Sequence, residues 1–169
     1  KFRQPLLIMV TIPFCFIGVV AGLLMFGSTL NLLSLLGLIS LAGVVVNNGI
    51  ILIDYINQLR KQRRQVLART KGTQNKDGEW EIILTPEQEE ELLRTSVLDG
   101  AASRIKPILI TTLTTLLGDI PMAVAKGEGS ELYASMGQAI AGGLLTSTLI
   151  TLILIPVIYY ISEKRGKHV

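Results

Sequence analysis

The stretch GVVVNNGIILIDY, residues 43–55, holds two adjacent asparagines, Asn47 and Asn48, in an otherwise apolar setting. The surrounding run, residues 4 to 53, contains no Asp, Glu, Lys, Arg or His. Such a run is long enough for two membrane crossings of ~20 residues each. Because a buried amide costs free energy unless it is hydrogen-bonded, this pair needs polar partners inside the membrane.

Uncharged, apolar runs also occur in the rest of the chain. Residues 132–162 are also uncharged, and a shorter uncharged run at 107–118 continues past Asp119. Only 17% of the residues are charged, and the mean hydropathy is +0.51. We therefore predict an all-α, polytopic membrane protein with four transmembrane helices, at about 5–27, 32–56, 106–125 and 136–161.

These helices form two pairs, separated by polar residues. The turn-forming stretch FGSTLN divides the pair within 1–56, and the glycine-rich stretch KGEGSE divides the pair within 106–161. Residues 57–105 form a connector between the pairs, and residues 162–169 form a tail. The chain starts with Lys1 rather than Met, so we expect it to be part of a longer protein.

Basic residues predict the orientation in the membrane. Of the 16 Lys and Arg residues, only Lys126 lies between the third and fourth predicted helices, and the others flank the opposite ends. Basic residues accumulate on the cytoplasmic side, so both chain ends and the connector should be cytoplasmic. The net charge of +3 follows from this topology and from contact with membrane lipids, so we expect no nucleic-acid partner.

The connector is predicted to hold one amphipathic helix at about 86–103. Thr85 is placed to cap it, Pro86 to open it and Gln88 to complete a capping box. Pro107 should lie near the start of the next helix. The connector shows no metal-ligand spacing, phosphate loop or nucleophile–base pair, so we expect no enzyme, no metal and no cofactor.

Small and polar residues share a face with Asn47. Gly37, Ser40 and Gly43 lie on that side at helical spacing, and Asp54 ends it. Small residues let membrane helices approach closely, and amides then hydrogen-bond across the contact. We expect this face to point into a helix bundle, and we expect Gly142 and Gly143 of the last helix to give similar close packing.

A second polar stripe lies on the third predicted helix. Arg104, Thr111, Thr115 and Asp119 are spaced by seven, four and four residues, so they share one face. An acid within a membrane helix suggests an ion path, whereas Asp119 near the outer loop could also be solvated among lipid headgroups.

The two stripes reach the same depth. Asn47 is seven residues from Asp54, and Thr111 is seven residues from Arg104. At a rise of about 1.5 Å per residue, Asn47 lies roughly 10 Å along the helix axis from Asp54, and Thr111 lies the same distance from Arg104. Spacing alone leaves two interpretations open, a proton or ion relay and hydrogen-bonded packing between helices.

Three motifs resemble transmembrane helices of resistance–nodulation–division (RND) transporters. LLSLLGLISLAGVVVNNGIILIDYINQLR is similar to their tenth helix, SRIKPILITTLTTLLGDIPMA to the eleventh and GQAIAGGLLTSTLITLILIPVIYY to the twelfth. Residues 5–27 resemble the ninth helix. The resemblance, to the AcrB/MexB-like hydrophobe/amphiphile type, covers nearly all of the chain except about 70–85.

This resemblance implies a C-terminal piece of a proton-driven efflux pump, a homotrimer of the bacterial inner membrane that works with a periplasmic adaptor and an outer-membrane channel. In the family, an aspartate pair on the fourth helix takes up protons beside residues of the tenth and eleventh. Asn47, Asn48, Thr111 and Arg104 occupy the matching positions, with Thr115, Asp119 and Asp54 as accessory candidates.

The chain departs from the family pattern in two ways. Asn47 stands where the best known branch has lysine, and no aspartate pair is present, so the paired-aspartate helix and the periplasmic domains must be supplied by the remainder of the same transporter. Two alternatives remain: a small standalone four-helix scaffold or assembly subunit, and an RND-superfamily lipid exporter or protein-translocation component.

Overall fold

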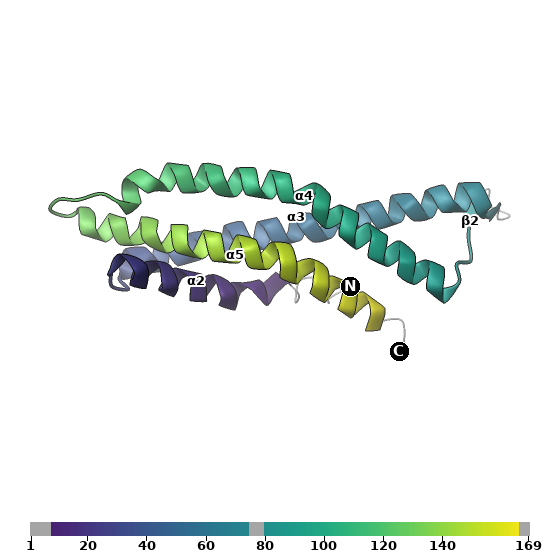
Figure 1. Ribbon diagram of the computed structural model, residues 1–169, viewed down its shortest axis with the longest axis horizontal. Coiled ribbons are helices and arrows are strands. Elements are labelled where there is room, and N and C mark those ends of the chain that lie inside the picture. The colour runs from purple at the N-terminus through teal and green to yellow at the C-terminus, as the bar shows by residue number, and fades with distance from the viewer. Residues whose placement is uncertain (1–7, 75–79, 166–169) are drawn as a thin grey trace.

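The computed structural model describes residues 8–74 and 80–165, and Figure 1 shows them as a bundle of long helices. The elements are, in chain order, α2 (Thr11–Phe26), α3 (Leu32–Lys71), β1 (Thr73–Gln74), β2 (Trp80–Glu81), α4 (Pro86–Ala123) and α5 (Ser130–Arg165). The strands pair antiparallel, Thr73 with Glu81 and Gln74 with Trp80. The predicted helical fold is thus confirmed, with one two-residue strand pair added.

Two of the described helices are long and apolar enough to cross a membrane. These segments are Leu32–Thr70 and Ser130–Lys164, and each includes an 18-residue stretch with a mean hydropathy of 2.1. The described part of the first predicted span is the shorter apolar helix Thr11–Phe26, and residues 1–7 of that span lie outside the described residues. Helix α4 does not meet the same criterion, because four threonines, two prolines and Asp119 interrupt the leucines and isoleucines of its apolar part, residues 107–123.

Two helices run through boundaries that the sequence analysis predicted. Helix α3 continues from the expected end at residue 56 to Lys71, and the predicted helices 86–103 and 106–125 are one helix, α4. Pro107 therefore lies inside α4 and not near a helix start. The Gln, Arg, Lys and Leu residues beyond residue 56 favour helix. A proline in a helix removes one backbone hydrogen bond, which neighbouring groups can compensate.

Local capping motifs fix two helix starts. The Thr85 hydroxyl accepts a hydrogen bond from the Gln88 backbone N–H, and the Gln88 side chain accepts one from the Thr85 N–H, as predicted. Asn31 and Ser34 form the same reciprocal box at the start of α3. The turn before it begins at Gly27, whose φ of 67° favours glycine.

Helix α5 is the central element, because each of α2, α3 and α4 packs more extensively against α5 than against any other helix. We call the end of the bundle with β1 and β2 the connector end, and the opposite end, with the two tight interhelical turns, the turn end. One apolar cluster lies toward the connector end and includes Leu52, Ile56, Leu93, Ile155 and Tyr159. The second joins α2, α3 and α5 and includes Cys15, Val19, Leu41, Ala139 and Leu144.

Glycines set the closest helix contacts. A Cβ atom added to Gly142 would lie 2.5 Å from the Gly22 Cα, and one added to Gly143 would lie 2.2 Å from a Leu41 methyl group. Gly37 packs on the Met136 backbone. By contrast, Gly43 has no atom within 4 Å of such a Cβ, and Ser40 is exposed, so neither packs on a helix in the described part of the chain.

The Gly22–Gly142 contact generates a prediction. Gly142→Ala should lower the stability of the full-length transporter by about 1–3 kcal/mol, because overpacking against backbone cannot be relieved by a side-chain rotation. Thermal unfolding of the detergent-solubilised protein measures this change. Gly118→Ala is the matched control, since a Cβ there has open space around it and alanine favours helix over glycine by about 1 kcal/mol. Equal unfolding midpoints for both variants would contradict the packing argument.

Candidate polar relay site

The two asparagines lie on α3 about midway through the apolar part of the helix. The Asn47 side chain is exposed and the Asn48 side chain is half-buried. Within residues 8–74 and 80–165, neither side-chain amide has a hydrogen-bond partner. Among the described residues, nothing covers this face around Asn47, which was predicted to point into a bundle, and Ser40 and Gly43 lie on the same open face.

The threonines of α4 divide into two groups. Thr111 and Thr115 donate their hydroxyl protons to backbone carbonyls one turn earlier, at 3.0 and 2.9 Å, so their oxygens keep lone pairs that can accept. Thr112 instead lies 4% exposed against α5, with its hydroxyl 3.1 Å from that of Thr148. The interhelical hydroxyl pair was not predicted, because the sequence does not show which threonine faces α5.

Arg104 joins α4 to α3. Its guanidinium carbon lies 4.2 Å from the centre of the Tyr55 ring, a distance typical of a cation–π interaction. The Arg104 Nε is buried and has no hydrogen-bond partner among the described residues. The neighbouring Asp54 is exposed and accepts a 2.7 Å hydrogen bond from Gln58 on its own helix.

The Arg104–Tyr55 contact fixes the relative height of the two polar stripes. Gly100 packs against Ile56 in the same region, so α3 and α4 run antiparallel there. Asn47 lies eight residues from Tyr55, and Thr111 lies seven residues from Arg104. With 1.5 Å rise per residue, both are about 10–12 Å from the contact. The structure thus brings these residues to one level, without a direct hydrogen bond between them.

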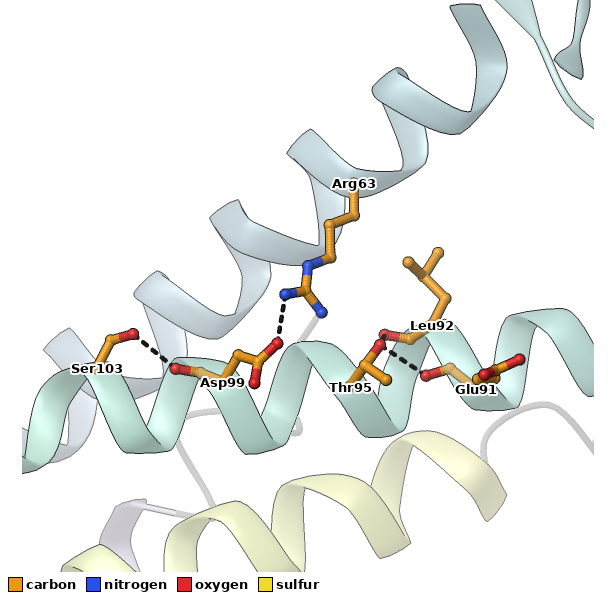
Figure 2. Close-up of polar contacts among 6 residues, drawn as sticks. All are labelled: Arg63, Glu91, Leu92, Thr95, Asp99 and Ser103. Carbon is orange, nitrogen blue, oxygen red and sulfur yellow. Dashed lines mark hydrogen bonds and ion pairs between the residues drawn. The ribbon is translucent and has the colours of Figure 1, made fainter. Parts of the chain in front are cut away.

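Polar contacts tie the helices together at the connector end. Arg63 of α3 pairs with Asp99 of α4, as Figure 2 shows, and Asp99 also accepts through its backbone carbonyl from Ser103. Arg60 pairs with Glu163 of α5 at 2.7 Å. The Tyr159 hydroxyl donates to Asn57 at 2.6 Å.

Glu90 adds a further link between α4 and α5. It accepts from the Tyr160 hydroxyl at 2.8 Å and from the Lys164 ammonium. Lys164 lies beyond the predicted span 136–161, and the hydrogen bond that its ammonium donates to Glu90 raises the pKa of Lys164 above its ordinary value. The α5 end is therefore held to both α3 and α4 by polar and charged groups.

Two buried polar atoms near the turn end lack partners among the described residues. They are one carboxylate oxygen of the half-buried Asp119 and the side-chain oxygen of Gln138. Asp119 was a predicted accessory residue. Gln138 was missed, because an isolated glutamine in a glycine-rich helix gives no signal of burial until the packing of α4 on α5 is known. No cluster of three or more metal-ligating acids, histidines or cysteines occurs in the described ranges.

Comparison with known proteins identifies relatives of the whole chain. The AcrB/AcrD/AcrF family profile matches residues 1–72 and 81–163. Protein HelA of Legionella pneumophila is 34% identical over 99% of this chain, and the multidrug resistance protein MdtC of Edwardsiella ictaluri is 33% identical over 97%. A crystal structure of a heavy metal efflux pump matches 96% of the chain with a TM-score of 0.71 and 32% identity.

The chain spans only a small part of each of these proteins. It covers 13% of HelA, and 14% of both MdtC and the heavy metal efflux pump. The unmatched residues 73–80 contain β1 and the first residue of β2. The profile gap thus falls in the region where the sequence resemblance was also absent.

Proposed function

The chain belongs to the AcrB/AcrD/AcrF family of RND transporters, and on this premise we propose that it supplies the C-terminal wall of a proton relay in a larger, proton-driven exporter. The observation that carries the proposal is the open polar face of α3 and α4. Asn47, Thr111 and the half-buried Asn48 have no side-chain partner on another described helix. Polar groups in the membrane need such partners, and the remainder of the transporter would provide them.

The chemistry of this face suits a protonatable partner. A side-chain amide can donate to a carboxylate and accept from a carboxylic acid, so Asn47 and Asn48 can hydrogen-bond either state of a partner aspartate. The Thr111 oxygen can accept while its proton bonds the helix backbone. Arg104, held over Tyr55, supplies a fixed positive charge that favours the ionised form of nearby acids.

The proposed setting follows from the family and the charge pattern. The transporter would lie in the bacterial inner membrane, with the connector end cytoplasmic and the turn end outside. It would act without a cofactor as a homotrimer, together with a periplasmic adaptor and an outer-membrane channel. One relative is named a multidrug resistance protein and the matching crystal structure is a heavy metal efflux pump, so the cargo would be a drug-like compound or a metal ion, bound by residues outside this chain.

The first prediction concerns Asn47 in the full-length transporter. A hydrogen bond to a charged group contributes about 1.5–3 kcal/mol, so Asn47→Leu should slow gradient-driven export roughly 10- to 100-fold. Export from proteoliposomes with an imposed proton gradient measures this rate. Ile51→Leu, one turn along the same helix face, is the control and should export normally. A wild-type rate for Asn47→Leu would assign the asparagines to packing instead.

A second prediction separates relay from packing on α4. Thr111→Val removes a hydroxyl from the open face and should reduce export, with little change in stability. Thr112→Val removes a hydroxyl from the buried contact with Thr148, which should cost about 0.6 kcal/mol of stability and leave export intact. Export rate and thermal unfolding are measured for both variants. The reverse result, with export lost only in Thr112→Val, would exclude Thr111 from the relay.

A further inference from the structure

A pocket lies at the connector end of the bundle, well away from the relay residues. Its volume of about 300 Å³ is at the lower end of the range for small-molecule sites. Helix α3, the residues between β2 and α4, and the first turns of α4 form it, and these three segments meet at the connector end in Figure 1. Leu92 of the pocket is twelve residues from Arg104, which is about 18 Å along the axis of α4.

Apolar side chains form the walls of this pocket. They come from all three segments and are Leu67, Ile82, Leu84 and Leu92. The Leu92 side chain points from α4 toward α3, as Figure 2 shows. Ile83 is 98% exposed, so the residues between β2 and α4 present alternate side chains to the pocket. This stretch is held at both ends, because β2 packs on α3 and the Thr85–Gln88 capping box starts α4.

Two neutral polar side chains on α4 complete the lining, and hydrogen bonds hold both in place. Gln88 accepts from the Thr85 backbone N–H at 3.1 Å through its Oε1. The Thr95 hydroxyl donates to the Glu91 backbone carbonyl at 2.8 Å, as Figure 2 shows. The Thr95 oxygen therefore keeps lone pairs with which it can accept a hydrogen bond from a ligand.

Glu91 is the one charged residue among the described residues that line the pocket. Its carboxylate has no hydrogen bond or ion pair within the described part of the chain. The two preceding acids differ, because Glu89 lies 3.9 Å from Arg64 and Glu90 pairs with Lys164. Of these three consecutive acids, the one without a partner is thus the one that lines the pocket.

We propose that this pocket binds an organic ammonium ion. The apolar body of the ligand packs among the leucines and Ile82, and its ammonium group donates to the Glu91 carboxylate and the Thr95 oxygen. Charge-assisted hydrogen bonds of this kind are the stronger ones in proteins. The carboxylate disfavours anions, and the apolar walls favour amines over inorganic cations. This inference goes beyond the proposed function and does not depend on it, because the pocket shares no residue with the relay.

The test uses the full-length transporter in detergent and the photoreactive probe 4-azidophenethylammonium. Light activates the azide, and mass spectrometry identifies the labelled peptides, which separates this pocket from any cargo site elsewhere in the transporter. Labelling of the peptides that contain Leu67, Leu84 and Leu92 should saturate. A neutral analogue, with a methyl group in place of the ammonium, should need a roughly two- to five-fold higher concentration for half-saturation, as expected for an ion pair at a partly exposed site.

Two variants test the two parts of the pocket. Glu91→Gln keeps the size of the side chain and removes its charge, so it should raise the half-saturating concentration of the ammonium probe by the same factor and leave the neutral analogue unaffected. Glu87→Gln is the matched control, because Glu87 is an exposed acid in the first turn of the same helix and does not line the pocket. Leu84→Asn makes a wall polar and should weaken the labelling by both compounds.

Three results would overturn the proposal. They are the absence of saturable labelling at these peptides, equal half-saturation by the ammonium probe and its neutral analogue, and unchanged labelling in Glu91→Gln. Equal half-saturation would mean that the pocket accepts apolar groups without regard to charge. Should Leu84→Asn fail to fold, Glu91→Gln and Glu87→Gln decide, because neither changes an apolar wall. Export by Asn47→Leu has no bearing on this result, so the two proposals fail or stand separately.

Discussion

The contact between Gly22 and Gly142 is the interaction on which the rest of this bundle depends. With no side chains between them, α2 and α5 approach backbone to backbone. In a bilayer, such contacts stabilise helix pairs through close packing, because the surrounding lipid is as apolar as the helices. Helix α5 can then lie at the centre of the bundle and pack its other faces against α3 and α4. Both polar stripes thus belong to helices that α5 supports from one side only, which leaves Asn47 and Thr111 open on the other.

Charges add a second level of organisation at the connector end. Ion pairs of Arg60, Arg63 and Glu90 join the three longest helices where the apolar cluster around Tyr159 ends. Exposed ion pairs contribute little stability individually, typically about 0–1 kcal/mol. The Arg63–Asp99 pair lies in the same antiparallel register of α3 and α4 as the Gly100–Ile56 packing and the Arg104–Tyr55 contact. That register determines that Asn47 and Thr111 share a level.

The sequence predicted structural features that depend on neighbouring residues, but not those that depend on contacts between distant segments. The Thr85–Gln88 capping box was predictable because every group in it lies within four residues. The continuation of α4 through Pro107 was not, since one lost backbone hydrogen bond is outweighed by helix on both sides. The polarity of the Asn47 face was evident, but the sequence did not show that no helix in the described part of the chain covers Ser40 and Gly43. Gln138 and the Thr112–Thr148 pair depend on the packing of α4 against α5, which no local pattern encodes.

The unbroken α4 also has a mechanical consequence. A 38-residue helix is about 57 Å long, so a tilt of only 5° about its turn end displaces its other end by about 5 Å. Asp119 lies near the turn end of α4, about which this tilt occurs. Strand β2 lies next to the opposite end of α4, which moves most, and residues 82–85 join the two. Small rearrangements among the membrane helices would therefore be amplified into large displacements of the strand pair. Strand β1, which the family profile does not match, pairs with β2 and so lies where such movement would be greatest.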